Sequence, residues 1–406
     1  MTKAFFDDEL LDAQLQRAMM AGDRDRCLAT AGRIGQTLDL EKWYDEWRSA
    51  GDAARKEAAD ALSANDSVTA CFRFFDAATF FRTAAVMLMS QPVDPRVVAA
   101  NHDQTDAFER GSSLLDRPPE RVQIPFEDTT LPGYFFDPTP ALQRPSAGPT
   151  LVLTGGYDGT AEELYHFTGA AALEHGYRVL CFDGPGQGAA LLQQRLVMRP
   201  DWENVIGAVL DWITDRNDVD ANRVALVGLS LGAHLAPRAA SAQHRLAACA
   251  ADCGSFDLAA AAFERIPKPL RAGLDPNKRI HAWILGKVLD VLAAKPTAGW
   301  ALRRGQLVHG ANRPIEYLRS LAPFSLKGRA EIITCPTFVN NAEDDDIGAS
   351  APQLVAELRC PHTFVTFRRN DGAGDHCEVG NRALYLETMF AWLDPILQAN
   401  PPNVSP

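Results

Sequence analysis

Gly228-Leu229-Ser230-Leu231-Gly232 follows directly after an apolar run at residues 223–227 and directly precedes a helical pattern. The apolar run predicts a strand, so the pentapeptide predicts a sharp turn from strand to helix. A nucleophilic serine has to project from such a turn, and only glycines on either side let the strand and the helix approach closely. Ser230 is therefore the candidate nucleophile. The backbone N–H of Leu231 lies at the expected start of the helix, where it can stabilise an oxyanion.

The chain on both sides of this turn alternates between strand and helix patterns. A hairpin is predicted first, and the strand-like runs as a whole are residues 121–126, 131–137, 150–154, 178–182, 223–227, 246–251, 332–339 and 363–367. Helical patterns between and after them occupy residues 160–175, 202–214, 231–240 and 381–397. Strands that alternate with helices of about 10 to 15 residues form βαβ units. The sequence therefore predicts an α/β fold with a mostly parallel sheet flanked by helices.

Two segments depart from this alternation. The first predicts helices only, at residues 8–21, 40–63, 67–90 and 95–115, and is ended by Pro118-Pro119. The second is mostly helical and too long for a simple connection, as is typical of active-site lids. We therefore expect a helical cap region at residues 1–115 and a catalytic domain at residues 116–406, with a lid insertion at about 255–328.

The third helix of the expected cap is rich in phenylalanine, at Phe72, Phe74, Phe75, Phe80 and Phe81. Apolar side chains at helical spacing are most often buried in a core. This stripe is also suited to form one wall of a pocket for an aromatic substrate. The two interpretations differ in whether the rings face other helices or a cavity.

A serine nucleophile needs a base, and nine histidines are available. In enzymes with a serine at this kind of turn the chain order is nucleophile, acid, histidine, so the base is expected after the last strand. His376 meets this condition, because it lies in a glycine-rich loop just past that strand. His234 is expected to pack or to line the pocket. His281 and His309 lie in the expected lid, where they can reach a substrate.

The acid is expected after the preceding strand, where residues 343–346 are four consecutive carboxylates. One carboxylate against the histidine ring would hold its tautomer and stabilise the imidazolium during proton transfer. Asp345 is preferred over Asp344 and Asp346, because it is the third residue after Ala342, where a glycine often opens this turn. Calcium binding needs alternating ligands, which this run lacks.

Two glycine motifs complete the candidate site. Thr-Gly-Gly-Tyr-Asp-Gly at residues 154–159 ends the first parallel strand, where the second oxyanion donor is expected. We assign this donor to the backbone N–H of Tyr157, with Gly156 as the alternative. Asp-Gly-Pro-Gly-Gln-Gly at residues 183–188 looks like a phosphate-binding loop but lacks the Lys-Ser/Thr of a P-loop, so it predicts a tight structural turn.

Composition limits the partners. Apolar residues make up 46% and charged residues 23%, which is ordinary for a globular chain, and the net charge is −12. An acidic surface repels phosphate backbones and anionic lipid, and no run of Lys or Arg is long enough to suggest a basic patch, so neither nucleic acid nor a membrane is expected as a partner. The eight cysteines are scattered and predict free thiols rather than a zinc site. The acidic residues near the N-terminus predict that no secretory signal is present.

We expect a cytoplasmic protein without a cofactor or metal.

Residues 120–398 resemble the α/β-hydrolase family, through the order of GLSLG, the turn FDGPGQG, the acidic turn after CPTFV, and His376. With W-Y-x-x-W at residues 43–47, DPRV at residues 94–97, LPGYFF and GGYDG, the whole chain is similar to one subgroup. It includes bacterial pseudooxynicotine hydrolases and fungal pigment enzymes that shorten a heptaketide naphthopyrone, and GAGDHCEVG makes the fungal group the nearer match. The resemblance implies an N-terminal helical cap, and several members hydrolyse a carbon–carbon bond beside a ketone.

These observations together predict a serine hydrolase that uses Ser230, His376 and Asp345. The expected reaction is cleavage of a carbon–carbon bond beside a ketone, through an acyl-enzyme, in an aromatic or β-diketone small molecule of polyketide type. A carboxylesterase or acyltransferase with the same triad is the alternative. A non-catalytic binding protein on a hydrolase scaffold is the more distant one, and a homodimer stays open.

Overall fold

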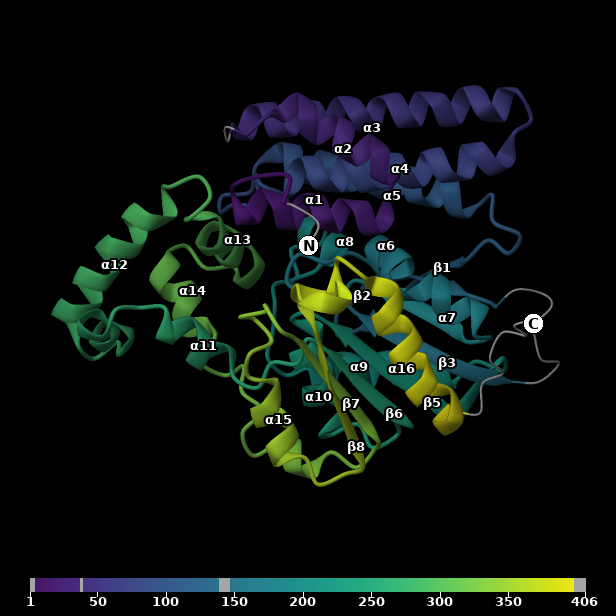
Figure 1. The fold of residues 1–406 in the computed structure, drawn as a ribbon. Helices are drawn as coiled ribbons and strands as arrows, with labels where there is room; N and C mark the ends of the chain where they lie inside the picture. The colour runs from purple at the N-terminus through teal and green to yellow at the C-terminus, as the bar shows by residue number, and fades with distance from the viewer. Residues whose placement is uncertain (1–3, 37–38, 139–146, 398–406) are drawn as a thin grey trace.

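The computed structural model describes residues 4–36, 39–138 and 147–397. At its centre is an eight-stranded sheet in the order β1-β2-β4-β3-β5-β6-β7-β8 (Figure 1). The strands are β1 Glu120–Phe126, β2 Thr129–Phe136, β3 Gly148–Thr154, β4 Arg178–Phe182, β5 Val219–Leu229, β6 Ala248–Asp252, β7 Thr337–Ala342 and β8 His362–Phe367. The hairpin β1–β2 pairs antiparallel and joins β4 antiparallel, and every other pairing is parallel. The predicted α/β fold with a mostly parallel sheet is confirmed.

Helices cover the sheet, and this explains its hydrophobic strands. Every residue of β3, β4 and β6 is buried, as expected for parallel strands with both faces covered. For example, α10 packs against β5 and β6, and α16 packs against β6. The helices around the sheet are α6 Ala161–Leu164, α7 Ala170–Glu174, α8 Gly188–Leu192, α9 Trp202–Thr214, α10 Gly232–Ala240, α15 Ala351–Glu357 and α16 Arg382–Leu397. A π-helical turn, Tyr165–Gly169, links α6 to α7 where one continuous helix was predicted.

Five helices precede the sheet and form a layer above it (Figure 1). They are α1 Glu9–Ala21, α2 Arg24–Ile34, α3 Leu40–Ser63, α4 Ser67–Val86 and α5 Pro95–Ser112. Each begins after an aspartate whose carboxylate accepts hydrogen bonds from the first turn: Asp8, Asp23, Asp39, Asp66 and Asp94. Such caps satisfy backbone N–H groups that would otherwise lack partners. The four predicted helices are present, and α2 is a further helix that was not predicted.

The phenylalanine stripe of α4 is part of the core. Phe74, Phe75, Phe80 and Phe81 are all buried, whereas Phe72 is 63% exposed. Phe75 contacts the rings of α5 and of the π-helical turn, and Phe80 packs on a tryptophan of α3. One hydrophobic cluster runs through these helices and the sheet. The interpretation of the stripe as core is confirmed, because four of its five rings are buried where the helices pack.

The segment between β6 and β7 is helical, and we call residues 255–328 the lid. Its helices are α11 Leu258–Glu264, η3 Lys268–Leu274, α12 Arg279–Ala293, α13 Trp300–His309 and α14 Pro314–Ser320. They enclose a small core of their own, separate from the main cluster. The Trp300 indole N–H donates to the Val86 carbonyl at 2.9 Å, which attaches α13 to the end of α4. Figure 1 shows the lid beside the sheet, with α12 outermost.

Several strand boundaries differ from their predictions, and the start of β7 differs most. The strand expected at residues 332–339 starts only at Thr337, after a short 3-10 turn, Ala330–Ile332. Pro336 directly precedes the strand and has no N–H to offer to the ladder, which explains the late start. Within the described ranges, no helix combines the length and the apolar character that crossing a membrane requires.

Candidate active site

Ser230 occupies the turn between β5 and α10 in a left-handed backbone conformation, with φ of 60°. Non-glycine residues rarely adopt this conformation, and where they do it is often at a functional site. A Cβ on Gly228 would lie 1.9 Å from the Gly232 carbonyl oxygen, and one on Gly232 would lie 2.3 Å from the Thr154 carbonyl oxygen. Strand and helix therefore approach as closely as the sequence predicts, and no other residue fits at either position.

The structure brings together the three side chains that the sequence singles out. His376 Nε2 lies 2.8 Å from Ser230 Oγ, and His376 Nδ1 lies 2.8 Å from Asp345 Oδ2. Asp345 also accepts hydrogen bonds from the backbone N–H groups of Ile347 at 2.8 Å and Gly348 at 3.0 Å. Ser230 follows β5, Asp345 follows β7 and His376 follows β8, so all three lie at the carboxyl edge of the parallel strands.

Burial distinguishes Asp345 from the other acidic residues of its turn. Its side chain is only 1% exposed. Asp344 and Asp346 are exposed, and Asp344 forms an ion pair with Arg369. Glu343 accepts the backbone N–H of Arg369 at 3.0 Å. Of the four carboxylates, Asp345 is the one bonded to His376.

The electrostatics of the pair favour a charged carboxylate beside the ring. Burial raises the pKa of Asp345, but the bond to His376 and the backbone N–H of Ile347 outweigh it, so the pKa lies below its usual value. Burial lowers the pKa of His376, but the neighbouring Cys377 and Asp345 raise it well above 6.5. The ring is therefore prepared to carry a proton in a site where Asp345 stays ionised.

Two buried cysteines support the loop that carries His376. The backbone N–H of Cys377 donates to Cys253 Sγ at 3.1 Å. Cys253, Cys377 and Glu378 all have positive φ, so the backbone is strained where the loop meets the end of β6. Burial raises the pKa of Cys377, but Cys253 and His376 lower it to about 7. The sequence shows only scattered thiols, since these cysteines are far apart in the chain.

Among the described residues, two groups of side chains around Cys253 could offer ligands to a metal ion: Cys253, His376 and Cys377, and Asp252, Cys253 and Glu378. Cys253, His376 and Cys377 offer ligand atoms that lie within 4.8 Å of one another. This donor set suits zinc. Both ring nitrogens of His376 are already bonded to Ser230 and Asp345. A metal ion bound to the ring would therefore break the hydrogen bond to Ser230 or the one to Asp345.

The glycine loop after β3 lies directly over the nucleophile. A Cβ on Gly156 would lie 3.0 Å from Ser230 Cβ and 3.2 Å from its Oγ. Gln187, from the turn after β4, donates its amide to the carbonyls of Gly155 at 2.8 Å and Gly156 at 3.3 Å. The Asp-Gly-Pro-Gly-Gln-Gly segment is thus a structural turn, and it holds this loop. The assignment of the oxyanion donors to Leu231 and to Tyr157 or Gly156 stays a prediction.

Asp158, in the same loop, is a buried ion-pair centre that the sequence did not reveal. Its carboxylate lies 3.0 Å from Arg17 of α1, 3.1 Å from Arg82 of α4 and 3.2 Å from Arg304 of α13. Burial raises the pKa of Asp158, but the three guanidinium groups outweigh it and hold the pKa far below its usual value. The only local signal was a carboxylate in a glycine loop, because the arginines come from three distant segments.

Tyr157 faces the lid. Its ring lies 5.5 Å from the ring of His309, and the Arg304 guanidinium lies 4.8 Å from its centroid. His309 Nδ1 is 2.9 Å from the hydroxyl of Ser320, and burial lowers the pKa of His309 to about 4. The lid therefore contacts the loop that lies over the nucleophile.

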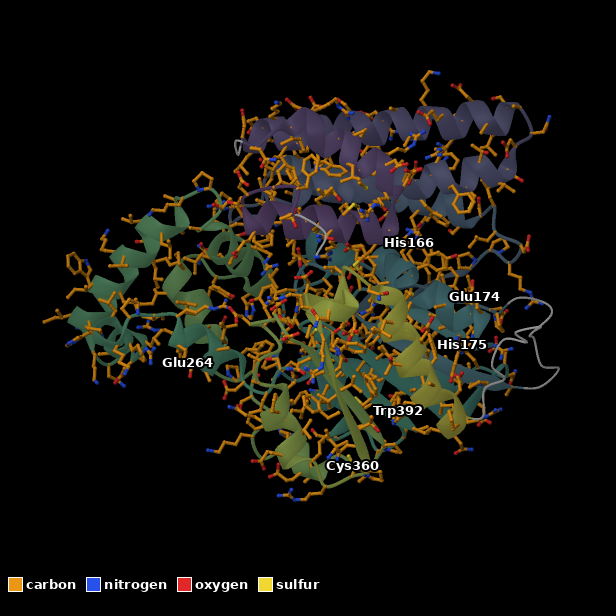
Figure 2. The ribbon with its side chains drawn as sticks, viewed as in Figure 1. His166, Glu174, His175, Glu264, Cys360 and Trp392 are labelled. Atoms are coloured by element: carbon orange, nitrogen blue, oxygen red, sulfur yellow. The ribbon has the colours of Figure 1, made fainter. Side chains whose placement is uncertain are left out.

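Other histidines lie apart from the group formed by Ser230, His376 and Asp345. His234 is fully buried, with Nδ1 3.0 Å from the Ser255 carbonyl, and burial lowers its pKa to about 4. His166 and His175 lie on the helical segment between β3 and β4 (Figure 2). His166 packs on Phe75 of α4, and His175 stacks on Phe390 of α16. His281 is exposed on α12. His234 is therefore a packing residue, which is the first of the two roles expected for it.

A small, partly open pocket with a cavity volume of about 40 Å³ lies beside the glycine loop. Its lining is mostly aliphatic and comes from the end of α4, from α5 and from the turn before α8: Arg82, Ala85, Val86, Met89, Val97, Asn101, Gln104, Asp158, Thr160, Gly186, Gly188, Leu191 and Leu192. None of the phenylalanines of α4 lines it, so the alternative of an aromatic wall is wrong for this cavity. Asp158 connects the cavity to the loop above Ser230.

Comparisons with known proteins find hydrolases. A sequence model described as the Alpha/beta hydrolase family matches residues 151–379, and one described as Esterase FrsA-like matches residues 37–258. The chain is 34% identical over 412 residues to the 20-hydroxy-prefusarin hydrolase FUS2 of Gibberella moniliformis, which covers 96% of both chains. It is also 34% identical over 419 residues to the hydrolase LUC6 of a Fusarium species, again over 96% of both chains.

A solved structure shares the fold along nearly the whole chain. It is the 2,6-dihydroxy-pseudo-oxynicotine hydrolase, which matches with a TM-score of 0.73 and 22% identity. The match covers 94% of this chain and 95% of the other. Because the identity is low, this likeness concerns the fold and not the reaction.

Proposed function

The chain belongs to the Alpha/beta hydrolase family, and from this premise we propose that it is a serine hydrolase that cleaves a carbon–carbon bond beside a ketone. The observation that carries the proposal is the bonded line Ser230–His376–Asp345, with 2.8 Å at both links. A serine is a weak nucleophile until a base takes its proton, and this line supplies the base and its orienting acid.

In the proposed first step, Ser230 Oγ transfers its proton to His376 Nε2 and attacks the carbonyl carbon of the substrate. Asp345 holds the ring and stabilises the imidazolium. The carbonyl oxygen becomes an oxyanion, which accepts hydrogen bonds from the N–H of Leu231 and from that of Tyr157 or Gly156. These donors lie in a buried turn and cost no reorganisation when the charge develops.

The tetrahedral intermediate then collapses. The bond between the carbonyl carbon and its neighbouring carbon breaks, its electron pair goes to the leaving carbon, and His376 supplies the proton. The acyl group stays on Ser230 as an ester. Water, deprotonated by His376, attacks this ester, and the proton returns to Ser230 as the carboxylic acid leaves.

The leaving group limits the substrate class. A carbanion leaves only when a second carbonyl or a phenol ring delocalises its charge, so we propose an aromatic or β-diketone small molecule of polyketide type. The name of the relative that acts on 20-hydroxy-prefusarin supports a small-molecule substrate. We further propose that residues 1–115 act as a cap and that the lid closes the pocket, as their contacts with the glycine loop suggest.

The second candidate function is ester hydrolysis or acyl transfer with the same three residues. The match to the Esterase FrsA-like model favours it. A substrate panel separates the two, because an esterase turns over simple p-nitrophenyl esters faster than any β-diketone. Faster turnover of β-diketones supports carbon–carbon cleavage, and the reverse order contradicts it. Full activity in the presence of EDTA supports the metal-free mechanism.

Labelling by a fluorophosphonate tests the serine mechanism itself. The probe should label the wild-type chain, and Ser230→Ala should abolish labelling. Ser255→Ala is the matched control, since Ser255 is also buried and lies just past β6 but is not bonded to His376. An unlabelled wild-type chain would favour a binding protein on a hydrolase scaffold and refute the proposal.

A further inference from the structure

The lid helix α12 has a second apolar face that faces solvent. Its buried side packs into the core of the lid through Leu285, Leu289 and Ala293. Five large apolar side chains on the other side are exposed: Ile280 74%, Trp283 64%, Ile284 40%, Val288 44% and Val291 67%. Burying the first face accounts for the fold of the lid. The second face needs another explanation, because contiguous exposed apolar patches mark interaction sites.

These side chains form one stripe along the helix. They stand at positions i, i+3, i+4, i+8 and i+11, which share a face, and the stripe from Ile280 to Val291 runs over about 16 Å at 1.5 Å per residue. Lys287 has the same helical phase and lies exposed in the middle of the stripe. Figure 1 shows α12 at the outer edge of the molecule, beyond α13 and α14 and away from the sheet.

The lid is basic although the chain is acidic. Residues 255–328 contain twelve Lys or Arg and five Asp or Glu, whereas the whole chain contains 40 and 52. Among the described residues, five exposed cations on or beside α12 form no ion pair with an acidic side chain: Lys268, Lys278, Arg279, Lys287 and Lys295. The net charge of −12, from which no membrane partner was expected, therefore coexists with a positively charged surface on the lid, whose cations are too scattered in the sequence to form a basic run.

We propose that the exposed face of α12 binds the surface of an anionic lipid bilayer. Trp283 and the aliphatic side chains enter the interfacial region, where amphipathic helices with tryptophan and basic residues bind. The methylene groups of Lys287 lie along the apolar stripe, and its ammonium group contacts lipid phosphates. The flanking cations add attraction to the same surface, and the acidic body of the molecule turns away from it.

A second copy of this chain is the competing occupant, and the charges disfavour it. Packing of α12 on itself across a two-fold axis would bring Lys287 towards its own copy and leave two ammonium groups in an apolar contact. A lipid surface pairs the same group with phosphate. The proposal goes beyond the hydrolase function and does not depend on it.

Vesicle sedimentation with the full chain tests the proposal. The wild type should sediment with vesicles of phosphatidylcholine and phosphatidylserine and stay in solution with phosphatidylcholine alone. Trp283→Ser should weaken binding about tenfold or more, from the lost apolar burial. Lys287→Glu should weaken it about twentyfold, since each basic residue near an anionic surface contributes about fivefold. Trp283→Phe should bind but lose part of the fluorescence shift on binding.

Phe72→Ser is the matched control, because Phe72 is 63% exposed on α4, far from α12 in the fold, and its loss should leave binding unchanged. All variants should keep the thermal midpoint and the turnover of a soluble ester. Three outcomes overturn the proposal. They are no sedimentation with either vesicle, equal sedimentation with both, and a wild-type dimer in analytical ultracentrifugation that Trp283→Ser dissociates without any vesicle binding.

Discussion

At the scale of single residues, the environment decides which of several similar groups can do chemistry. Asp345 and Asp344 are neighbours in the chain, yet one is buried against His376 and the other lies in solvent with Arg369. The backbone N–H groups of Ile347 and Gly348 donate hydrogen bonds to Oδ1 and Oδ2 of Asp345 and help to keep this carboxylate ionised. Burial with satisfied hydrogen bonds, rather than residue type, therefore singles out the acid.

The first prediction compares these neighbours. Asp345→Asn should lower kcat about 10³- to 10⁴-fold, because an amide favours the wrong tautomer of His376. Asp344→Asn should change kcat less than about twofold, as it removes an exposed ion pair of little energetic weight. Steady-state kinetics on one substrate measure both. Equal losses in the two variants would mean that the turn, and not the buried carboxylate, matters.

The second prediction concerns pH. His376 has to be neutral to act as a base, and its raised pKa means that kcat/KM climbs with pH through a midpoint above 6.5. Cys377, with its pKa near 7, stabilises the protonated ring when it is a thiolate. Cys377→Ala should therefore lower the pKa of His376 and move the acid limb of the pH profile to lower pH. Cys335→Ala, a buried cysteine elsewhere, is the control, and identical acid limbs in Cys377→Ala and wild type would contradict the idea.

At the scale of elements, the end of β6, the start of α16 and the π-helical turn meet next to the nucleophile. The Asp252 carbonyl accepts the backbone N–H of Ser230 at 3.1 Å, and its carboxylate pairs with Arg382 at the start of α16. Arg382 also donates to the Thr168 hydroxyl at 3.2 Å in the π-helical turn. Burial and the nearby Asp252 raise the pKa of Glu378 to about 11, so this residue is a neutral acid at neutral pH.

The third prediction separates the two buried acids. Asp252→Asn should lower the free energy of unfolding by about 3 to 5 kcal/mol, because it leaves the buried Arg382 without its counter-charge. Glu378→Gln should cost about 1 kcal/mol or less, since an amide replaces an acid that is already neutral. Urea unfolding of both variants gives the comparison. A larger loss for Glu378→Gln would show that Glu378 carries a charge.

At the scale of the whole molecule, Asp158 ties three parts of the chain to the loop above Ser230. Arg17 and Arg82 come from the helical layer and Arg304 comes from the lid. The helical layer shares its hydrophobic core with the sheet, and the lid has a second, smaller core of its own. The lid also joins the main core through Trp300, Leu307 and Val308 of α13, and the Trp300 bond to Val86 adds a polar contact.

The fourth prediction tests this tie. Asp158→Asn should lower the free energy of unfolding by about 1 to 3 kcal/mol, because Arg304 loses its acidic partner while Arg17 and Arg82 keep Glu163. It should also lower kcat about tenfold to a hundredfold, because the loop over Ser230 loses its anchor. Asp103→Asn is the control: Asp103 also pairs with two arginines, Arg48 and Arg55, but is partly exposed, so its loss should cost about 1 kcal/mol or less.

These controls decide between anchoring and general destabilisation. Calorimetry gives the stability change, and kinetics at a temperature well below unfolding give kcat. If Asp158→Asn unfolds more easily but keeps full kcat, the ion-pair centre is structural only. If neither quantity changes, the three arginines find other partners, and the tie between lid, helical layer and loop does not hold.

The sequence by itself determined the local structure and the candidate site. Residues 178–182 and 40–63 were predicted with the bounds of β4 and α3, because apolar periodicity and capping act over neighbouring residues. Ser230, His376 and Asp345 were found through a turn motif and the chain order of the fold, and the structure brings them within hydrogen-bond distance. The two glycines of the turn were required by contact between adjacent elements, which is also a local constraint.

Only the tertiary structure decided which distant residues meet. The three arginines on Asp158 stand at positions 17, 82 and 304, and Cys253 supports a loop more than 120 residues later in the chain. No local pattern encodes such meetings, because ion pairs and buried contacts form between whatever the packing of the layers brings together. The exposure of the apolar stripe of α12 was likewise decided only by the tertiary structure. Its apolar residues follow the pattern of any core helix, and only the packing of the lid shows which side faces solvent.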